Sequence, residues 1–365
     1  MRDTSWSSTG GHSSLANCAA LGAALLAPLL LQALGTHWVR IADTCLLYTM
    51  LALGMNIVVG YAGLLDLGYV AFYAVGAYTL ALLTSPHLTD NFAWIATMAP
   101  AGLHAPWWIT VPLAAALAGV VGTLLGAPTL KLRGDYLAIV TLGFGEIVRI
   151  LINNLGHPIN ITDGAKGLIQ IDSIALFGLN LGRQLSFGSF DIASVTLYCY
   201  LLLALAALTV LVCHRLQHSR IGRAWMAMRD DEMAAAAMGI DTRNMKLLAF
   251  GIGAGFGGVA GAMFGALQGF VSPDAFSLQE SVMIVAIVVF GGMGHIRGVI
   301  LGAVLLTAVP EMLRYVVNPI QAMTDGRLDA AILRQLLIAL AMIITTLLRP
   351  HGLWPPPEHG GPQAR

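Results

Sequence analysis

The chain has 365 residues, of which only 10% are charged, and its mean hydropathy is +0.76. A soluble domain needs about a quarter of its residues charged, so this composition excludes an ordinary soluble protein and indicates one that resides in a lipid bilayer. The formal net charge is zero and the sequence pI is about 7.1, which gives no support for a nucleic-acid partner.

Ten apolar segments follow one another along the chain, and each approaches the roughly 20 residues that a helix needs to cross a membrane. The sequence therefore predicts an all-α, polytopic integral membrane protein with about 10 transmembrane helices. The second, third, eighth and ninth segments are rich in glycine, so each is either continuous or broken and re-entrant. The segments lie at 15–34, 40–58, 67–84, 107–127, 135–155, 191–213, 246–269, 276–293, 299–316 and 329–348.

The charges of the connecting loops predict the orientation, because lysine and arginine are enriched on the cytoplasmic side. The loops at 85–106 and 269–276 carry neither residue, and the loop at 156–190 carries only Lys166 and Arg183. Most other basic residues fall in loops of the opposite side. We therefore place these three loops outside and both termini in the cytoplasm.

The two ends of the chain differ in composition from the region between them. Residues 1–14 and the Pro/Gly/His-rich residues 350–365 are predicted to be disordered tails. Ala33-Leu34-Gly35 has the form of a signal-peptidase site, but the apolar run before it is longer than the core of a typical signal peptide. We favour an uncleaved span, which gives a transmembrane domain at 15–349.

Among the ionisable residues in or beside the predicted spans, where charges are costly and often functional, we single out three. Asp66 belongs to the glycine cluster GYAGLLDLG. Glu146 and Arg149 are three residues apart on one helix face and can pair. The pair either lines a translocation path, where it would meet a zwitterionic solute, or locks the helix bundle as a neutral unit.

A polar island, HRLQHSRIGRAWMAMRDDEMAAAAMGI at 214–240, separates the sixth and seventh spans. Ile221, Trp225 and Met228 follow helical spacing, Gly239 can end a helix, and Asp241 can cap the next one. Methionines and alanines among the charges offer an adaptable apolar surface that includes Trp225 and Met228. The island is either a docking element or a helix lying on the lipid surface, and its three consecutive acids favour docking.

The seventh span carries glycine at every fourth position. Residues this far apart lie on nearly one face of a helix, so another helix can approach that face closely. The strip is either a static packing surface or a surface along which a neighbour slides. Its members are Gly253, Gly257, Gly261, Gly265 and Gly269.

Motifs of common enzymes are missing from the sequence. Lys131, Lys166 and Lys246 follow Leu, Ala and Met, so the chain has no phosphate-binding loop of the Gly-Lys-Ser/Thr type. It also has no H-E-x-x-H or G-x-S-x-G motif. The four cysteines lie in apolar surroundings without metal-ligand spacing. We therefore expect no catalytic residue, no metal site and no cofactor bound by this chain.

Three long stretches resemble a known family. KLRGDYLAIVTLGFGEIVRILINN, SRIGRAWMAMRDDEMAAAAMGIDTRNMKLLAFGIGA and VVFGGMGHIRGVILGAVL are similar to LivM-type permeases of branched-chain amino acid ABC importers, and the similarity covers roughly residues 40–355. The resemblance implies an inner-membrane, multi-pass permease subunit. It also implies four kinds of partner: a LivH-like second permease, two cytoplasmic ATPases that bind ATP, a periplasmic amino-acid-binding protein and the lipid bilayer.

The resemblance further implies that residues 214–246 form the region that couples the permease to an ATPase. The residues expected to carry this role are Arg220, Gly222, Arg223, Trp225, Arg229, Glu232 and Gly239.

The sequence therefore predicts a translocation subunit that moves leucine, isoleucine and valine inward and is not itself an enzyme. Permeases for urea, amides or other amino acids share the layout and remain alternatives. An ion-coupled secondary carrier would need ionisable residues at the middle of the membrane, and only Glu146 and Arg149 offer that. A membrane enzyme has no motif in its favour.

Overall fold

The computed structural model describes residues 26–323, except for short gaps at 99–101, 131, 133, 158–159, 177 and 188–189, and a few positions between 336 and 353. The predicted tails lie almost wholly outside the described residues. The tenth predicted span and the first half of the first predicted span also lie almost wholly outside the described residues. The second half of the first span is helical at 26–34.

Long apolar helices form most of the described structure. Five are long and apolar enough to cross a membrane, counting only the described residues. They are α2 (Thr36–Asn56) with its π-helical extension η1 (Ile57–Tyr61), α6 (Trp107–Thr129), α8 (Ser194–Gln217), α11 (Thr242–Gln268) and the start of α13 (Ile296–Met323). A sixth, α7 (Asp135–Asn154), has similar length and carries Glu146 and Arg149. These helices confirm the corresponding predicted segments.

Two predicted spans are shorter in the structure than a full crossing requires. The third segment forms α3 (Val70–Thr84) with 15 residues, and the eighth forms α12 (Leu278–Gly291) with 14 residues. A helix needs about 20 residues to cross the hydrocarbon core. The third and eighth segments, which the sequence leaves as either continuous or broken, therefore form short helices, and the chain before α3 is non-helical.

The chain between η1 and α3 is non-helical and enters the bundle. The Leu67 N–H donates to Thr141 Oγ1 of α7 at 3.0 Å, and Ser281 Oγ of α12 donates to the Leu67 carbonyl at 2.6 Å. Thr141 lies six residues into α7, or about 9 Å from the start of that helix. Irregular backbone at membrane depth requires such cover, because lipid offers no hydrogen-bonding partner.

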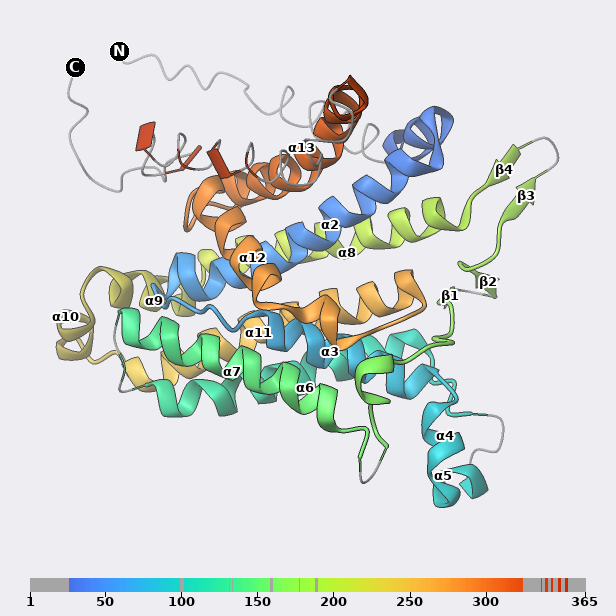
Figure 1. The fold of residues 1–365 in the computed structure, drawn as a ribbon. Helices are drawn as coiled ribbons and strands as arrows, with labels where there is room; N and C mark the ends of the chain where they lie inside the picture. Colours follow the sequence, from blue (N-terminus) through green and yellow to red (C-terminus); the bar gives the residue numbers. More distant parts are fainter. Residues whose placement is uncertain are drawn as a thin grey trace, which may run out of the picture.

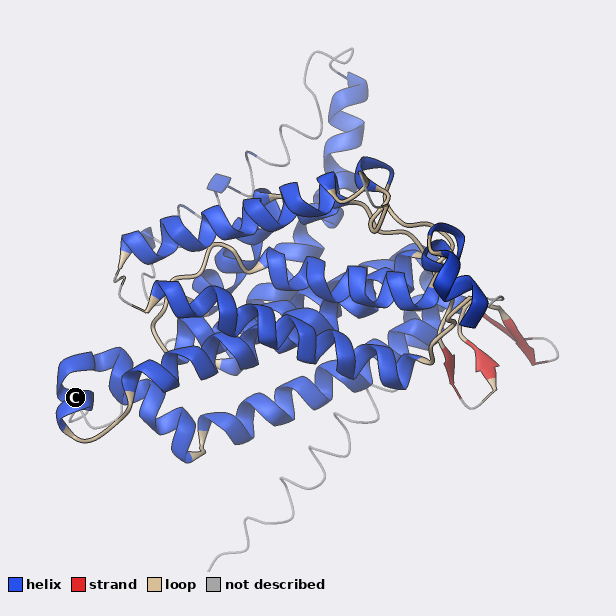
Figure 2. Cartoon of the chain, turned by 90° about the horizontal axis from the view of Figure 1, so that it is seen from below, coloured by secondary structure: helices blue, strands red, loops and turns tan. Residues whose placement is uncertain are grey.

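The loops gather at the two ends of the bundle (Figures 1 and 2). One end carries α9 (Arg220–Asp230) and α10 (Glu232–Ala237). The opposite end carries α4 (His87–Asn91), α5 (Ala93–Met98) and two antiparallel hairpins. The three loops predicted to lie outside thus meet at one end, as expected from their charges, with the short helices η2 (Gly164–Lys166) and η3 (Pro273–Phe276) among them.

The hairpins were not predicted. Strand β1 (Ala175–Leu176) pairs with β2 (Leu179–Asn180) so that Leu176 faces Leu179, and β3 (Leu185–Phe187) pairs with β4 (Phe190–Ile192) so that Ser186 faces Asp191. Gly178 in the first turn has φ = +85°, a conformation that glycine adopts readily. Strands of two or three residues are too short to give a periodic signal in the sequence.

The core lies along α11. This helix packs against α3, α6 and α2, while α2 also contacts α8, α12 and α13 (Figure 1). Large side chains of α2, including Met50, Leu53 and Met55, are completely buried. Glycine and alanine on α11 permit the close approach of two helices on either side of it.

Candidate coupling and translocation sites

Each helix of the polar island starts at a side-chain cap. Ser219 Oγ accepts a hydrogen bond from the Gly222 N–H at 3.1 Å, and Asp231 Oδ1 accepts one from the Met233 N–H at 2.8 Å. Asp241 Oδ1 likewise accepts from the Asn244 N–H at 3.1 Å, and Gly239 adopts φ = +87° just after α10. The helix end predicted at Gly239 and the cap predicted at Asp241 are confirmed. These caps fix where α9, α10 and α11 begin.

The inner face of α9 is locked onto the bundle. Trp225 is completely buried, and its indole Nε1–H donates to the Met245 carbonyl of α11 at 2.8 Å. A Cβ atom added to Gly222 would lie 2.3 Å from the Leu216 carbonyl oxygen, so only glycine fits there. The expectation that Trp225 and Met228 belong to the exposed apolar surface is wrong, because both side chains are buried within the chain.

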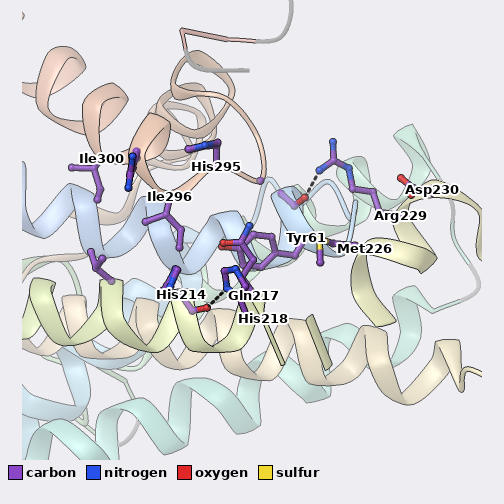
Figure 3. A pocket seen from close by; sticks show the side chains of 14 residues that line it. Tyr61, His214, Gln217, His218, Met226, Arg229, Asp230, His295, Ile296 and Ile300 are labelled. Carbon is purple, nitrogen blue, oxygen red and sulfur yellow. Dashed lines mark hydrogen bonds between the residues drawn. The ribbon is translucent and has the colours of Figure 1, made fainter. Parts of the chain in front are cut away.

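Two basic residues tie the island to distant parts of the chain. Arg229 Nη1 donates to the Gly60 carbonyl of η1 at 2.5 Å, in the last turn of the second span (Figure 3). The helix breaks off into irregular chain after Tyr61, and we call this span the broken span. Lys246 Nζ, almost completely buried, lies 2.6 Å from Glu232 Oε1 and joins α11 to α10. The island therefore contacts both the broken span and the first turns of α11.

The outer face of the island is exposed and partly apolar. Met233 is 68% exposed and Met238 is 85% exposed. Arg220 and Arg223 are also exposed, and Arg223 Nη1 donates to the His218 carbonyl at 3.0 Å. We call this surface, made by Arg220, Arg223, Met233 and Met238, the docking face. An exposed methionine pair beside arginines is typical of an interaction surface.

The glycine strip of α11 faces α2 and α3. A Cβ added to Gly261 would lie 2.0 Å from the Tyr73 carbonyl oxygen, and one added to Gly253 would lie 2.5 Å from Val58 Cγ2. Gly257 lies beside Phe72 and Tyr69, and Gly265 beside Val271 and Ala77. Gly269 does not belong to the packing surface, because it ends α11 in a left-handed conformation and faces open space.

A second glycine face of α11 packs against α6 and was not predicted. A Cβ added to Gly258 would lie 2.6 Å from the Ala114 carbonyl oxygen, and Gly251 and Gly255 approach Thr123 and Ala115. The sequence signal was present in the spacing 251, 255 and 258, but it is less regular than the strip at every fourth position. Helix α11 is therefore held between two closely packed neighbours.

Glu146 and Arg149 pair with each other on α7. Arg149 Nε donates to Glu146 Oε1 at 3.0 Å and to Oε2 at 3.1 Å. The Arg149 side chain is 33% exposed and that of Glu146 is 37% exposed, and the neighbouring Ile147 and Ile150 are at least half exposed. A charged pair on a face that this chain leaves uncovered is costly in lipid, which favours a protein partner or a water-filled path beside it.

Asp66 lies in the buried segment between η1 and α3. Its side chain is 1% exposed, and Oδ1 accepts a hydrogen bond from the Gly68 N–H at 2.8 Å. It lines a cavity of about 10 Å³ with Thr141 and Phe144, which is the size of about one water molecule. Asp66 bonds within its own segment and Glu146 bonds to Arg149, so hydrogen bonds do not join the three predicted residues.

Two further acidic residues lie inside the bundle. Asp43 of α2 is completely buried beside the thiol of Cys199 on α8, and Glu280 of α12 accepts a hydrogen bond from the Tyr48 hydroxyl. Neither residue was singled out from the sequence. Asp43 falls within the predicted span 40–58. An acidic residue among apolar ones is the sequence pattern that could have pointed to it.

Metal-ligating side chains do not cluster in the part of the chain that the structure describes: no three His, Cys, Asp or Glu residues there come together as a metal site. Cys45, Cys199 and Cys213 are free and buried.

Known proteins similar to the chain come from one transport family. Residues 38–346 match the family described as branched-chain amino acid transport system / permease component. The chain is 42% identical over 329 residues to the high-affinity branched-chain amino acid transport system permease protein LivM of Escherichia coli K12, which covers 87% of this chain and 70% of that relative. The LivM protein of Salmonella typhimurium LT2 matches with the same identity and coverage.

A more distant relative carries a different name. The permease protein LivH of Escherichia coli K12 is 24% identical over 266 residues, which covers 71% of this chain and 79% of the relative. No solved structure is significantly similar to the chain.

Proposed function

This chain belongs to the branched-chain amino acid transport permease family, and we propose that it is the LivM-like subunit of an ATP-driven importer in the bacterial inner membrane. The solutes are leucine, isoleucine and valine, which follows from the names of its 42% identical relatives. The end with α9 and α10 faces the cytoplasm, and the end with the two hairpins faces the periplasm.

The subunit works with partners that supply what it lacks. A LivH-like permease completes the path, and a periplasmic binding protein delivers the amino acid at the hairpin end. Two cytoplasmic ATPases bind and hydrolyse ATP, because this sequence has no phosphate-binding loop. ATP is thus the cofactor of the partners and not of this chain.

The contacts of the polar island supply a coupling route. An ATPase that moves against the docking face displaces α9, and Arg229 transmits that displacement to Gly60 of the broken span. Trp225 and Lys246 transmit it to the first turns of α11. Two packed arrangements of these elements would give the outward-facing and inward-facing states.

The path itself runs along the uncovered face of α7. Glu146 and Arg149 offer one negative and one positive group, which match the ammonium and carboxylate of an amino acid. Asp66 belongs to the buried segment that packs on α7 at Thr141. It therefore lies behind this face rather than on it. The pair exchanges partners with the passing zwitterion and re-forms after it leaves.

The anchored island with an exposed methionine face is the observation that carries the proposal. Met233→Asp places a charge on the docking face without touching the buried contacts of Trp225 or Lys246. We expect loss of ATPase copurification with normal membrane insertion, whereas Met233→Leu retains the complex. Normal copurification and uptake with Met233→Asp would show that α10 is not the ATPase contact.

A further inference from the structure

A cavity of about 950 Å³ lies beside the island, and Arg229 and Gly60 of the coupling route form part of its wall. The broken span contributes Gly60 and Tyr61, and the last turns of α8 contribute Val210, His214 and His218. The third wall comes from the loop and helix start at 294–300. In Figure 3 Tyr61 lies between the labelled α8 side chains and those of His295 and Ile296.

The polar lining of this cavity favours an anion. Arg229 and Arg297 contribute two fixed positive charges, against a single carboxylate, Asp230. Burial, followed by the nearby charge of Arg297, lowers the pKa of His295, so this imidazole is neutral at pH 7. The excess charge in the cavity is therefore positive.

The buried hydroxyl of Tyr61 indicates that the cavity holds a ligand. Tyr61 is only 1% exposed and lines the cavity, yet its hydroxyl has no hydrogen-bond partner among the described residues. An unsatisfied buried hydroxyl is costly, and an acceptor oxygen of a ligand would satisfy it.

The position of the cavity identifies which anion can reach it. Helix α8 ends at Gln217 and α13 begins at Ile296, so the cavity lies where two membrane helices meet the water interface. Val210, Ile296 and Ile300 contribute apolar side chains to its wall. Basic pockets between transmembrane helices on the cytoplasmic side bind phosphate headgroups of anionic lipids.

We propose that this cavity binds the phosphate headgroup of an anionic phospholipid from the inner leaflet. The phosphate lies between Arg229 and Arg297 and accepts a hydrogen bond from the Tyr61 hydroxyl. The glycerol and the first acyl carbons lie along Val210, Ile296 and Ile300. The lipid thus occupies the space between the broken span and the island. The assignment of this end of the bundle to the inner leaflet rests on the proposed function.

The test uses the assembled transporter in nanodiscs that contain equal amounts of phosphatidylglycerol and phosphatidylcholine. After extraction into a mild detergent, mass spectrometry measures the retained lipid. We expect selective retention of phosphatidylglycerol, a loss of about fivefold with Arg297→Gln, and no loss with the control Arg215→Gln. Arg215 is exposed in the last turn of α8 but does not line the cavity.

Tyr61→Phe gives a second readout, because it removes only the hydroxyl and should also lower phosphatidylglycerol retention. Retention of inorganic phosphate without lipid would assign the cavity to a free anion and overturn the proposal. The proposal would also be overturned if both lipids were retained equally, or if the Arg215 and Arg297 variants lost equal amounts of phosphatidylglycerol. A complex without bound lipid would overturn it as well. The last result would show that an ATPase subunit covers the cavity.

Discussion

Arg229 is the residue that connects the surface of the coupling region to the interior of the bundle. It is on α9, yet its guanidinium reaches the Gly60 carbonyl in a different part of the sequence. Gly63 allows the side chain to pass, since a Cβ there would lie 2.9 Å from Arg229 Cγ. A charged donor held by a backbone carbonyl at a helix break is suited to transmit a displacement rather than to recognise a solute.

Arg229→Gln removes this contact while the docking face stays intact. Hydrogen bonds to charged groups contribute about 1.5 to 3 kcal/mol, so we expect ATP-driven uptake to fall by about tenfold or more. Copurification of the ATPases should be unchanged, because Met233 and Met238 are unaffected. Arg215→Gln, an exposed change nearby, should retain uptake. Equal uptake by the Arg229 variant and the wild type would remove this contact from the coupling route.

At the scale of elements, α11 is confined on two sides by glycine contacts. Its backbone approaches α3 at Gly261 and α6 at Gly258. Such contacts have little room for side chains, and added volume in a packed core costs about 1 to 3 kcal/mol. The structure therefore supports close packing of the predicted strip up to Gly265, while a sliding role needs a functional test.

Gly261→Leu should abolish uptake, and Gly261→Ala should already impair it, because a Cβ would lie 2.0 Å from the Tyr73 carbonyl oxygen. Gly255→Ala is the matched control on the same helix, since a Cβ there would meet only the Ala115 carbonyl oxygen, at an ordinary contact distance of 3.4 Å. Uptake and complex yield are measured together. Loss of both indicates static packing, and normal assembly with poor transport indicates sliding. Wild-type uptake by Gly261→Leu would exclude the strip from the mechanism.

Helix α7 presents the Glu146–Arg149 pair on a face that the described chain leaves partly open. A pair that only stabilises the helix would tolerate reversal of its two charges. A pair that meets a zwitterion would not, because reversal changes which end of the solute each group attracts.

The double variant Glu146→Arg with Arg149→Glu separates these roles. We expect normal assembly, since the side chains can still pair at the i, i+3 spacing, but a large loss of leucine uptake. Each single variant, Glu146→Gln or Arg149→Gln, should lose uptake as well. Recovery of uptake in the double variant to the wild-type rate would assign the pair to bundle stability alone.

Sequence patterns predicted the elements whose signal is local. The spans α2, α6, α7, α8 and α11 follow from apolar length, and the ends of α10 and α11 follow from Gly239 and Asp241. The buried segment before α3 and the direction of Trp225 depend on contacts with α7, α12 and α11, which lie far away in the sequence. Hydropathy cannot distinguish a full span from a short helix followed by covered irregular backbone.

At the scale of the whole molecule, the two ends of the bundle have different roles. One end carries the two hairpins, where the proposed function places the binding protein, and the other end carries α9 and α10 with the docking face. Between them, the broken span and α11 connect the island to the bundle interior. Buried Asp43 and Asp66 are the groups that a proton-coupled carrier would use, so the energy source separates the two functions most sharply.

The most direct measurement is leucine uptake into proteoliposomes that contain this chain and its LivH-like partner, with and without the ATPases and the binding protein. The account predicts uptake only when the ATPases, internal ATP and the binding protein are all present. A proton or sodium gradient alone should give none. Robust gradient-driven uptake without the ATPases would contradict the assignment to an ATP-driven importer.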